Sequence, residues 1–115
     1  MVEDSEVREI AALLEDEYAH AILIHTSTEE MSAPELSDAC DASVSTIYRR
    51  IDRLQEHDLL AEQLNLDRDG HHYNTYTARL ERIEIELVDG AFEITVTYRP
   101  EDAADRFTEL FEGLR

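Results

Sequence analysis

Residues 32–60, SAPELSDACDASVSTIYRRIDRLQEHDLL, predict two helices joined by a tight turn. Ser32 and Glu35 have the spacing of a capping box, and Pro34 is tolerated in the first turn of a helix. We expect this first helix to bury three small or apolar side chains, those of Leu36, Ala39 and Cys40. The turn then falls at Asp41-Ala42.

The second helix of the pair is predicted to begin after Ser43, whose hydroxyl can cap it. Its apolar residues recur at i, i+4 and i+7 and should form one buried face: Ile47, Ile51 and Leu54. The other face carries hydroxyl, aromatic and charged side chains: Ser45, Thr46, Tyr48, Arg49, Asp52 and Arg53. At the end of this helix Asp58 occupies a position that often needs left-handed backbone geometry.

Two helices are predicted before this pair. The first is expected to be capped by Ser5 and to carry an apolar stripe: Val7, Ile10, Ala11 and Leu14. The second should begin near Asp16 and end before the polar run 26–30. Its predicted inner positions are Tyr18, Ala21, Ile22 and His25.

Two β-hairpins are predicted after the pair. Residues 59–66 and 72–78 flank Asp69-Gly70, which we interpret as a two-residue turn. A second turn at Asp89-Gly90 places three cross-strand apolar pairs on one face: Leu87 with Phe92, Ile85 with Ile94, and Ile83 with Val96. Pro100 ends this sheet, and a last helix is expected from Glu101.

Helix, turn, helix and hairpin in this order are the plan of a winged helix-turn-helix. We therefore expect a single α+β domain over residues 1–115, with an additional β-hairpin and a C-terminal dimerisation helix. Its predicted parts are helices and wing (5–78), second hairpin (79–99) and C-terminal helix (101–114). The apolar stripe of that last helix is the predicted dimer interface: Phe107, Leu110, Phe111 and Leu114.

Charge is unusual in amount and in kind. The chain has 28 acidic and 10 basic residues, and every basic residue is arginine. A surface covered in carboxylates without lysine suits solubility in concentrated salt, where charges are strongly screened. The hydrophobic content of 43% indicates a folded chain, and the single cysteine excludes an internal disulfide framework. No apolar run of membrane-spanning length and no signal peptide occur in the sequence, so we expect a cytoplasmic protein without a membrane partner.

The positive charge is concentrated around the second helix of the pair. Residues 41–80 hold seven acids and five arginines, whereas residues 1–40 hold eleven acids and one arginine. Such a helix can enter the major groove of DNA, and the hairpin can reach the adjacent backbone or minor groove. The predicted DNA-binding residues are Ser43, Ser45, Thr46, Tyr48, Arg49 and Arg53 on the helix, with Arg68 and His71 on the wing.

The stretch 34–60, followed by LDRDGHHY at 66–73, resembles winged-helix regulators of the ArsR and MarR type. STIYRRIDRL, residues 45–54, is especially similar to their recognition helices. The added hairpin and last helix resemble small haloarchaeal members of this group, among them oxidative-stress regulators. The resemblance implies a homodimeric transcriptional regulator of double-stranded DNA. One departure is Asp41, where the family commonly places glycine.

Several alternatives stay open at this stage. The helix arginines could instead pair with Asp52 and Glu56 as a solvated face, and Arg50 is the arginine most suited to a structural role. Cys40 could be a redox sensor, but a packing role as a small buried apolar side chain is favoured. The histidine spacings do not suit chelation, so no metal or other cofactor is predicted, although potassium ions could be held at the DNA interface. No nucleophile–base pair or phosphate loop indicates an enzyme.

The main rival function is a winged-helix protein-interaction module that does not bind specific DNA. A weaker alternative is a repressor that responds to a small molecule. The sequence alone identifies no pocket for such a ligand.

Overall fold

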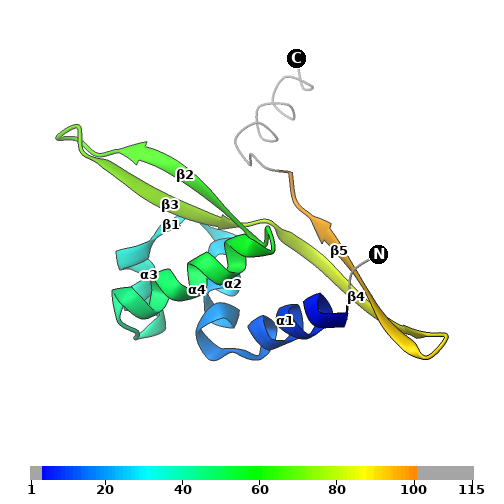
Figure 1. Ribbon diagram of the computed structural model, residues 1–115. Coiled ribbons are helices and arrows are strands. Elements are labelled where there is room, and N and C mark those ends of the chain that lie inside the picture. The colour runs from blue at the N-terminus through cyan, green and yellow to red at the C-terminus, as the bar shows by residue number, and fades with distance from the viewer. Residues whose placement is uncertain (1–3, 101–115) are drawn as a thin grey trace, which may run out of the picture.

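The computed structural model describes residues 4–100, in which four helices gather on one side and two hairpins project in opposite directions (Figure 1). The predicted α+β arrangement of helices followed by hairpins is confirmed. The predicted C-terminal helix, 101–114, lies outside the described residues. The elements in chain order are α1 (Asp4–Glu15), α2 (Glu17–Thr28), β1 (Met31–Ser32), α3 (Ala33–Cys40), α4 (Val44–Glu56), β2 (Leu60–Leu66), β3 (His72–Ala78), β4 (Leu80–Val88) and β5 (Ala91–Tyr98).

The main core lies between the helices and the wing. The apolar face predicted for α4 is confirmed, since all three of its side chains are fully buried. They pack with side chains from the neighbouring helices and from the entry to β2: Leu13, Ile22, Leu36, Leu59 and Leu60. Burial on this scale fixes α4 on the body of the protein and leaves its opposite face open to solvent.

The wing is the hairpin of β2 and β3, and it belongs to a three-stranded antiparallel sheet of order β1-β3-β2. Leu60 pairs with Ala78 at its base, and Leu66 pairs with His72 near its tip. The two-residue strand β1 was not predicted. It pairs Met31 with Tyr76 and so ties the start of α3 to the wing.

The predicted caps of α3 and α4 are confirmed. Ser32 accepts a hydrogen bond from the Glu35 amide at 3.3 Å, and the Ser32 amide donates to the Glu35 carboxylate at 2.9 Å. Ser43 accepts from the Thr46 amide at 3.2 Å. Between the two helices Asp41 adopts left-handed geometry, with φ of 51°, where glycine is the easier residue. The turn therefore forms despite the departure from glycine.

Three expectations about the first helices are wrong in detail. Leu13 is buried and Ala11 is exposed, and Ser5 lies inside α1 and does not cap it. In α3 Ala39 is exposed although it was expected to be buried, whereas Ala33 is buried and Cys40 is only half-buried.

The inner face of α2 also differs from the prediction, since its buried residues are Ala19, Ile22, Leu23 and Thr26. This helix continues to Thr28, although a polar run was expected to end it earlier. In this extension the hydroxyl groups donate to carbonyls of the preceding turn. Thr26 donates to Ile22 at 2.7 Å, and Ser27 donates to Ile24 at 2.6 Å.

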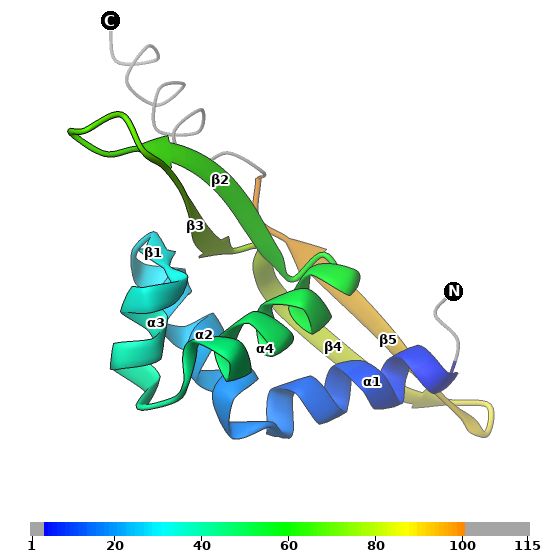
Figure 2. The ribbon, with the colours of Figure 1, turned by 60° about the vertical axis from the view of Figure 1, so that its left-hand side comes forward.

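The second hairpin turns at Asp89-Gly90, both with positive φ as a type I′ turn requires. Its three predicted cross-strand pairs are confirmed. Helix α1 lies along this hairpin (Figure 2), and Val7 and Ile10 pack against Ile94 in a small second core. Beyond α1 the apolar face is not covered by any other segment between residues 4 and 100, and its exposed residues are Ile85, Leu87 and Phe92.

Candidate nucleic-acid interface

Helix α4 presents the residues predicted to contact DNA on the face opposite to its buried side. Ser45, Tyr48 and Arg49 are exposed, as is Arg53 one turn further on, and Thr46 is half-buried. The first turn of a helix also carries unpaired backbone N–H groups and partial positive charge, which favour phosphate oxygens. The N-terminal half of α4 is therefore suited to an anionic partner.

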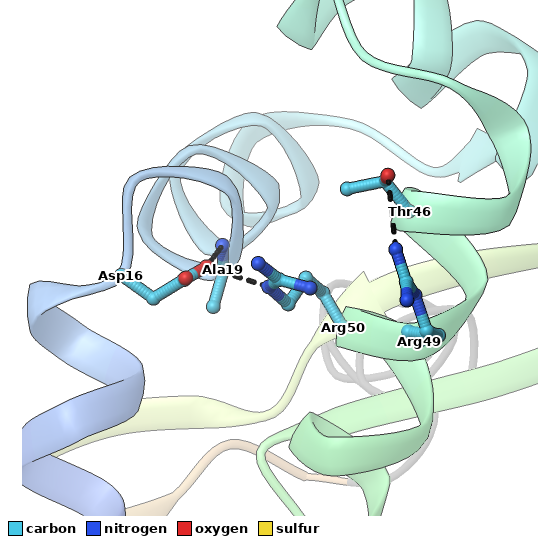
Figure 3. Close-up of polar contacts among 5 residues, drawn as sticks. All are labelled: Asp16, Ala19, Thr46, Arg49 and Arg50. Carbon is cyan, nitrogen blue, oxygen red and sulfur yellow. Dashed lines mark hydrogen bonds and ion pairs between the residues drawn. The ribbon is translucent and has the colours of Figure 1, made fainter.

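Three hydroxyl groups and one guanidinium meet at the start of α4. The Ser43 hydroxyl donates to Thr46 Oγ1 at 2.9 Å and lies 3.2 Å from Ser45 Oγ. Arg49 Nη2 donates to the same Thr46 oxygen at 3.5 Å (Figure 3). These long or mutual contacts hold the groups together but leave most of the Arg49 donors available to a ligand.

Arg50 has a structural role, as the sequence indicated. Its Nε lies 2.9 Å from Asp16 Oδ2, and the same carboxylate oxygen accepts the Ala19 amide at 2.8 Å to cap α2 (Figure 3). The guanidinium also stacks on the Tyr18 ring, with 5.7 Å to its centroid. The hydrogen bond from Arg50 lowers the pKa of Asp16 below its usual range. Arg50 thus joins α4 to α2 and faces away from the open surface.

The remaining α4 arginines are not paired along their own helix. Within residues 4–100, neither Arg49 nor Arg53 forms an ion pair with Asp52 or Glu56. The alternative of a self-paired solvated face therefore lacks support, because a helical salt-bridge face needs such i, i+3 or i, i+4 contacts.

Tyrosine side chains line the angle between α4 and the wing. Tyr48 is 46% exposed, so it does not pack beneath the wing. Tyr76 on β3 is buried, and this burial, followed by a hydrogen bond with Glu62, raises its pKa strongly. The Tyr76 side chain therefore stays protonated and packs in the main core, whereas the exposed Tyr48 side chain remains available to a partner.

The wing loop differs from the predicted two-residue turn. The Asp67 amide donates to the His71 carbonyl at 2.9 Å, which leaves a three-residue loop, and only Gly70 in it has positive φ. Asp67 Oδ1 accepts the amides of Asp69 and His71 at 2.9 and 2.8 Å. The predicted contact residues Arg68 and His71 are both exposed on this loop.

Two features of the wing were missed by sequence reasoning. Side-chain ligand atoms of Asp67, Asp69 and His71 lie within 4.8 Å of one another. The sequence signal was their i, i+2, i+4 spacing, which the spacing of the histidines alone does not reveal. Leu64 and Leu66 are each 62% exposed on β2, and their alternation with Asn65 could have indicated one apolar edge of the wing.

Cys40 lies at the end of α3 and packs, half-buried, against the main core. Burial raises the pKa of its thiol. A thiol in this state is less reactive than a sensor cysteine, which needs a lowered pKa and exposure. The packing role expected from the sequence is therefore the better supported one.

Comparison with known proteins identifies part of this arrangement. Residues 10–63 match the model of a helix-turn-helix domain, a span that runs from α1 to β2 and includes α3, the turn and α4. No curated protein matches the chain significantly. Among residues 4–100 no helix is long and apolar enough to cross a membrane. Residues 10–63 are therefore similar to a helix-turn-helix domain, and α4 lies within the matched span as the second helix of the α3–α4 pair.

Proposed function

We propose that the protein is a sequence-specific regulator of transcription that binds double-stranded DNA as a homodimer. The observation that carries this proposal is that the arginines of α4 have two different environments. Arg50 is held by Asp16, while Arg49, Arg53 and the hydroxyl groups face solvent within a helix-turn-helix domain. A helix placed in this way can lie in the major groove with its first turns at the base edges.

Each exposed group has a role in this proposal. Arg49 would contact a base edge, with Ser45 and Thr46 beside it, and Ser43, Tyr48 and Arg53 would position the backbone. Arg68 and His71 would bring the wing to a neighbouring phosphate or into the minor groove. Potassium ions would share the interface with the surrounding carboxylates. The resemblance to haloarchaeal regulators supports activity in high salt and a role in the oxidative-stress response.

A binding experiment with two arginine variants tests the assignment. The operator would first be selected from random duplexes by the full chain in molar KCl. We expect Arg49→Ala to weaken binding to the selected site by about 1–3 kcal/mol, while binding to scrambled DNA changes little. Arg68→Ala should weaken both duplexes by similar amounts, because a backbone contact carries no base information.

Arg82→Ala is the control for charge. Arg82 is exposed on the second hairpin and pairs with Glu84 at 2.6 Å, so its loss should leave binding to both duplexes nearly unchanged. Equal losses on selected and scrambled DNA for Arg49→Ala would contradict a base contact. Failure to select any site would favour the protein-interaction module, to which the exposed apolar residues Ile85, Leu87 and Phe92 also point.

The homodimer is proposed from the apolar stripe of Phe107, Leu110, Phe111 and Leu114, which lies outside the described residues. Such a stripe can join two subunits about a two-fold axis that suits a palindromic site. Truncation after Pro100 should then give monomers or an aggregating chain with much weaker DNA binding. Light scattering in high KCl measures this, and a truncated chain that stays dimeric would exclude the stripe as the main contact.

A further inference from the structure

A cavity of about 470 Å³ lies where the winged helix meets the second hairpin. The end of α2, the end of β3 and the open ends of β4 and β5 contribute to its wall. Residues that bear on the argument are Ser27, Glu29, Arg79, Glu81 and Arg99. This volume is within the range of small-molecule sites, about 300–1,000 Å³.

Two arginines in the wall have no carboxylate partner among residues 4–100. The Arg99 amide donates to the Arg79 carbonyl, which brings both residues to the same end of the hairpin. Neither guanidinium forms an ion pair with any residue between 4 and 100. Two neighbouring like charges repel each other. In a chain with 28 acids and 10 arginines, the lack of a partner here is unexpected.

The Arg79 side chain also contains a buried donor without an acceptor. Its Nε is buried and has no hydrogen-bond partner within the described part of the chain. One donor of the Arg99 guanidinium is already used, because its Nη1 donates to the Ser27 carbonyl at 3.1 Å. Buried donors are nearly always satisfied in folded proteins, so Arg79 is short of acceptors in this position. Its Nη1 and Nη2 also form no hydrogen bond within residues 4–100, and these terminal nitrogens are the donors that a ligand oxygen in the cavity could reach.

We infer that this cavity binds a small zwitterionic carboxylate of the size and charge of a free α-amino acid. A guanidinium presents donors in a fork that matches the two oxygens of one carboxylate. Glu29 and Glu81, also in the wall, disfavour a ligand of higher negative charge such as phosphate. The same two carboxylates can accept hydrogen bonds from an ammonium group on the ligand.

A series of side-chain contacts leads from this cavity to α4. The Arg79 guanidinium lies over the Tyr98 ring, 5.3 Å from its centroid. The Tyr98 hydroxyl donates to the carbonyl of His57, the residue that caps the C-terminal end of α4, at 3.3 Å. A ligand that draws Arg79 toward the cavity therefore acts on the element that the proposed function places in the major groove. This regulatory part of the inference rests on that function.

Calorimetry of the full chain tests the binding site without DNA. The probes are the free α-amino acids in constant KCl and, for each, the matching acid that lacks the amine. At least one amino acid should bind saturably and more tightly than its amine-free counterpart. Arg79→Gln and Arg99→Gln should each weaken that binding at least about tenfold, the loss of one charge-assisted contact. Arg82→Gln, on the same hairpin but outside the cavity, should bind like the wild type.

A second variant keeps the test decisive if the arginine variants fail to fold. Glu81 is exposed, so Glu81→Gln should fold, and it should reduce the preference for the amino acid over its amine-free counterpart. The site would be overturned if no amino acid gave a saturable heat of binding to the wild type. It would also be overturned if both arginine variants had native circular dichroism spectra and bound the amino acid as the wild type does. An unchanged preference in Glu81→Gln would overturn it as well.

Tyr98→Phe separates binding from its effect on DNA. Phenylalanine keeps a ring beneath Arg79 but removes the hydrogen bond to His57. The variant should bind the amino acid like the wild type, while the ligand-dependent change in DNA affinity is lost. A full ligand effect in Tyr98→Phe would overturn the route through His57. A chain that binds the amino acid but no DNA would contradict the proposed function and support the site.

Discussion

At the scale of single residues, Asp16 serves two elements with one carboxylate, as the N-cap of α2 and the partner of Arg50 on α4. We expect Asp16→Ala to lower the free energy of unfolding by about 1–2 kcal/mol, since an N-cap is worth roughly 1 kcal/mol and the ion pair is also lost. Asp16→Asn should cost less, because asparagine still caps a helix. Denaturant unfolding at constant KCl measures both, and equal costs would mean that the cap contributes nothing.

The same carboxylate makes the free energy of unfolding depend on pH. The hydrogen bond from Arg50 is the main cause of the lowered pKa of Asp16 in the folded protein, against a usual value of 3.8. The ionised Asp16 carboxylate therefore contributes its full stabilisation of the fold above pH 3.8. This contribution is lost as the pH falls through the lower pKa of Asp16 in the folded protein. The stability advantage of wild type over Asp16→Asn should hold at neutral pH and shrink below pH 3.8. An advantage that does not change with pH would exclude a charged contribution from Asp16.

The pairing of Arg50 with Asp16 shows where sequence reasoning reaches its limit at this scale. The sequence indicated Arg50 as the structural arginine from its place on the helix. It could not supply the partner, which lies 34 residues earlier in the chain. Helical spacing predicts neighbours three or four residues apart, and Asp52 and Glu56 were the only acids it offered. The choice between a solvated face and an open binding face therefore needed the packing of α2 against α4.

At the scale of elements, the second hairpin depends on α1 for its core. Ile94 is 5% exposed and packs on α1, whereas its cross-strand partner Ile85 is 48% exposed. We expect Ile94→Ala to lower the free energy of unfolding by about 2–4 kcal/mol and Ile85→Ala by less than about 1 kcal/mol. Thermal or denaturant unfolding compares them. Equal losses would show that something else, such as a second subunit, covers the hairpin tip.

Both hairpins were predicted, but only one of their two turns was predicted correctly. Asp89-Gly90 is a type I′ turn because both residues take positive φ, which this dipeptide favours. At Asp69-Gly70 only the glycine does, because Asp67 accepts two loop amides and closes a three-residue loop. The dipeptide is the same, so the difference comes from a side chain two residues earlier. Strand β1 was missed for a related reason, since two residues carry no periodic pattern.

At the scale of the whole molecule, negative charge is distributed unevenly along the chain. The α4 face and the wing hold the predicted DNA contacts in the least negative third of the chain, while residues 1–40 and 81–115 carry most of the acids. Even so, the wing itself bears carboxylates at Glu62, Asp67 and Asp69, all of them exposed. DNA carries condensed cations of its own. Binding would bring these carboxylates close to phosphates and would require cations between them.

This arrangement predicts an unusual response to salt. A basic repressor releases cations on binding, so log K falls with log salt at a slope near −0.9 for each phosphate neutralised. Here cations taken up by the wing carboxylates would partly cancel those released at Arg49 and Arg53. Affinity should therefore fall only slightly between about 1 and 3 M KCl, or even rise. Binding constants for the selected duplex, fitted against KCl concentration, measure the slope.

A triple variant tests the origin of that slope. Glu62→Gln, Asp67→Asn and Asp69→Asn together should make it steeper, and asparagine at 67 keeps the oxygen that accepts the loop amides. The matched control neutralises three acids on the far hairpin: Glu86→Gln, Asp89→Asn and Glu93→Gln. It changes the net charge equally but should leave the slope almost as in the wild type, because these sites lie on the hairpin that projects away from the wing (Figure 1). If both triple variants shift the slope equally, net charge alone sets the salt response. If neither does and the wild-type slope is steep, the arginines act as in a basic repressor and the carboxylates serve solubility only.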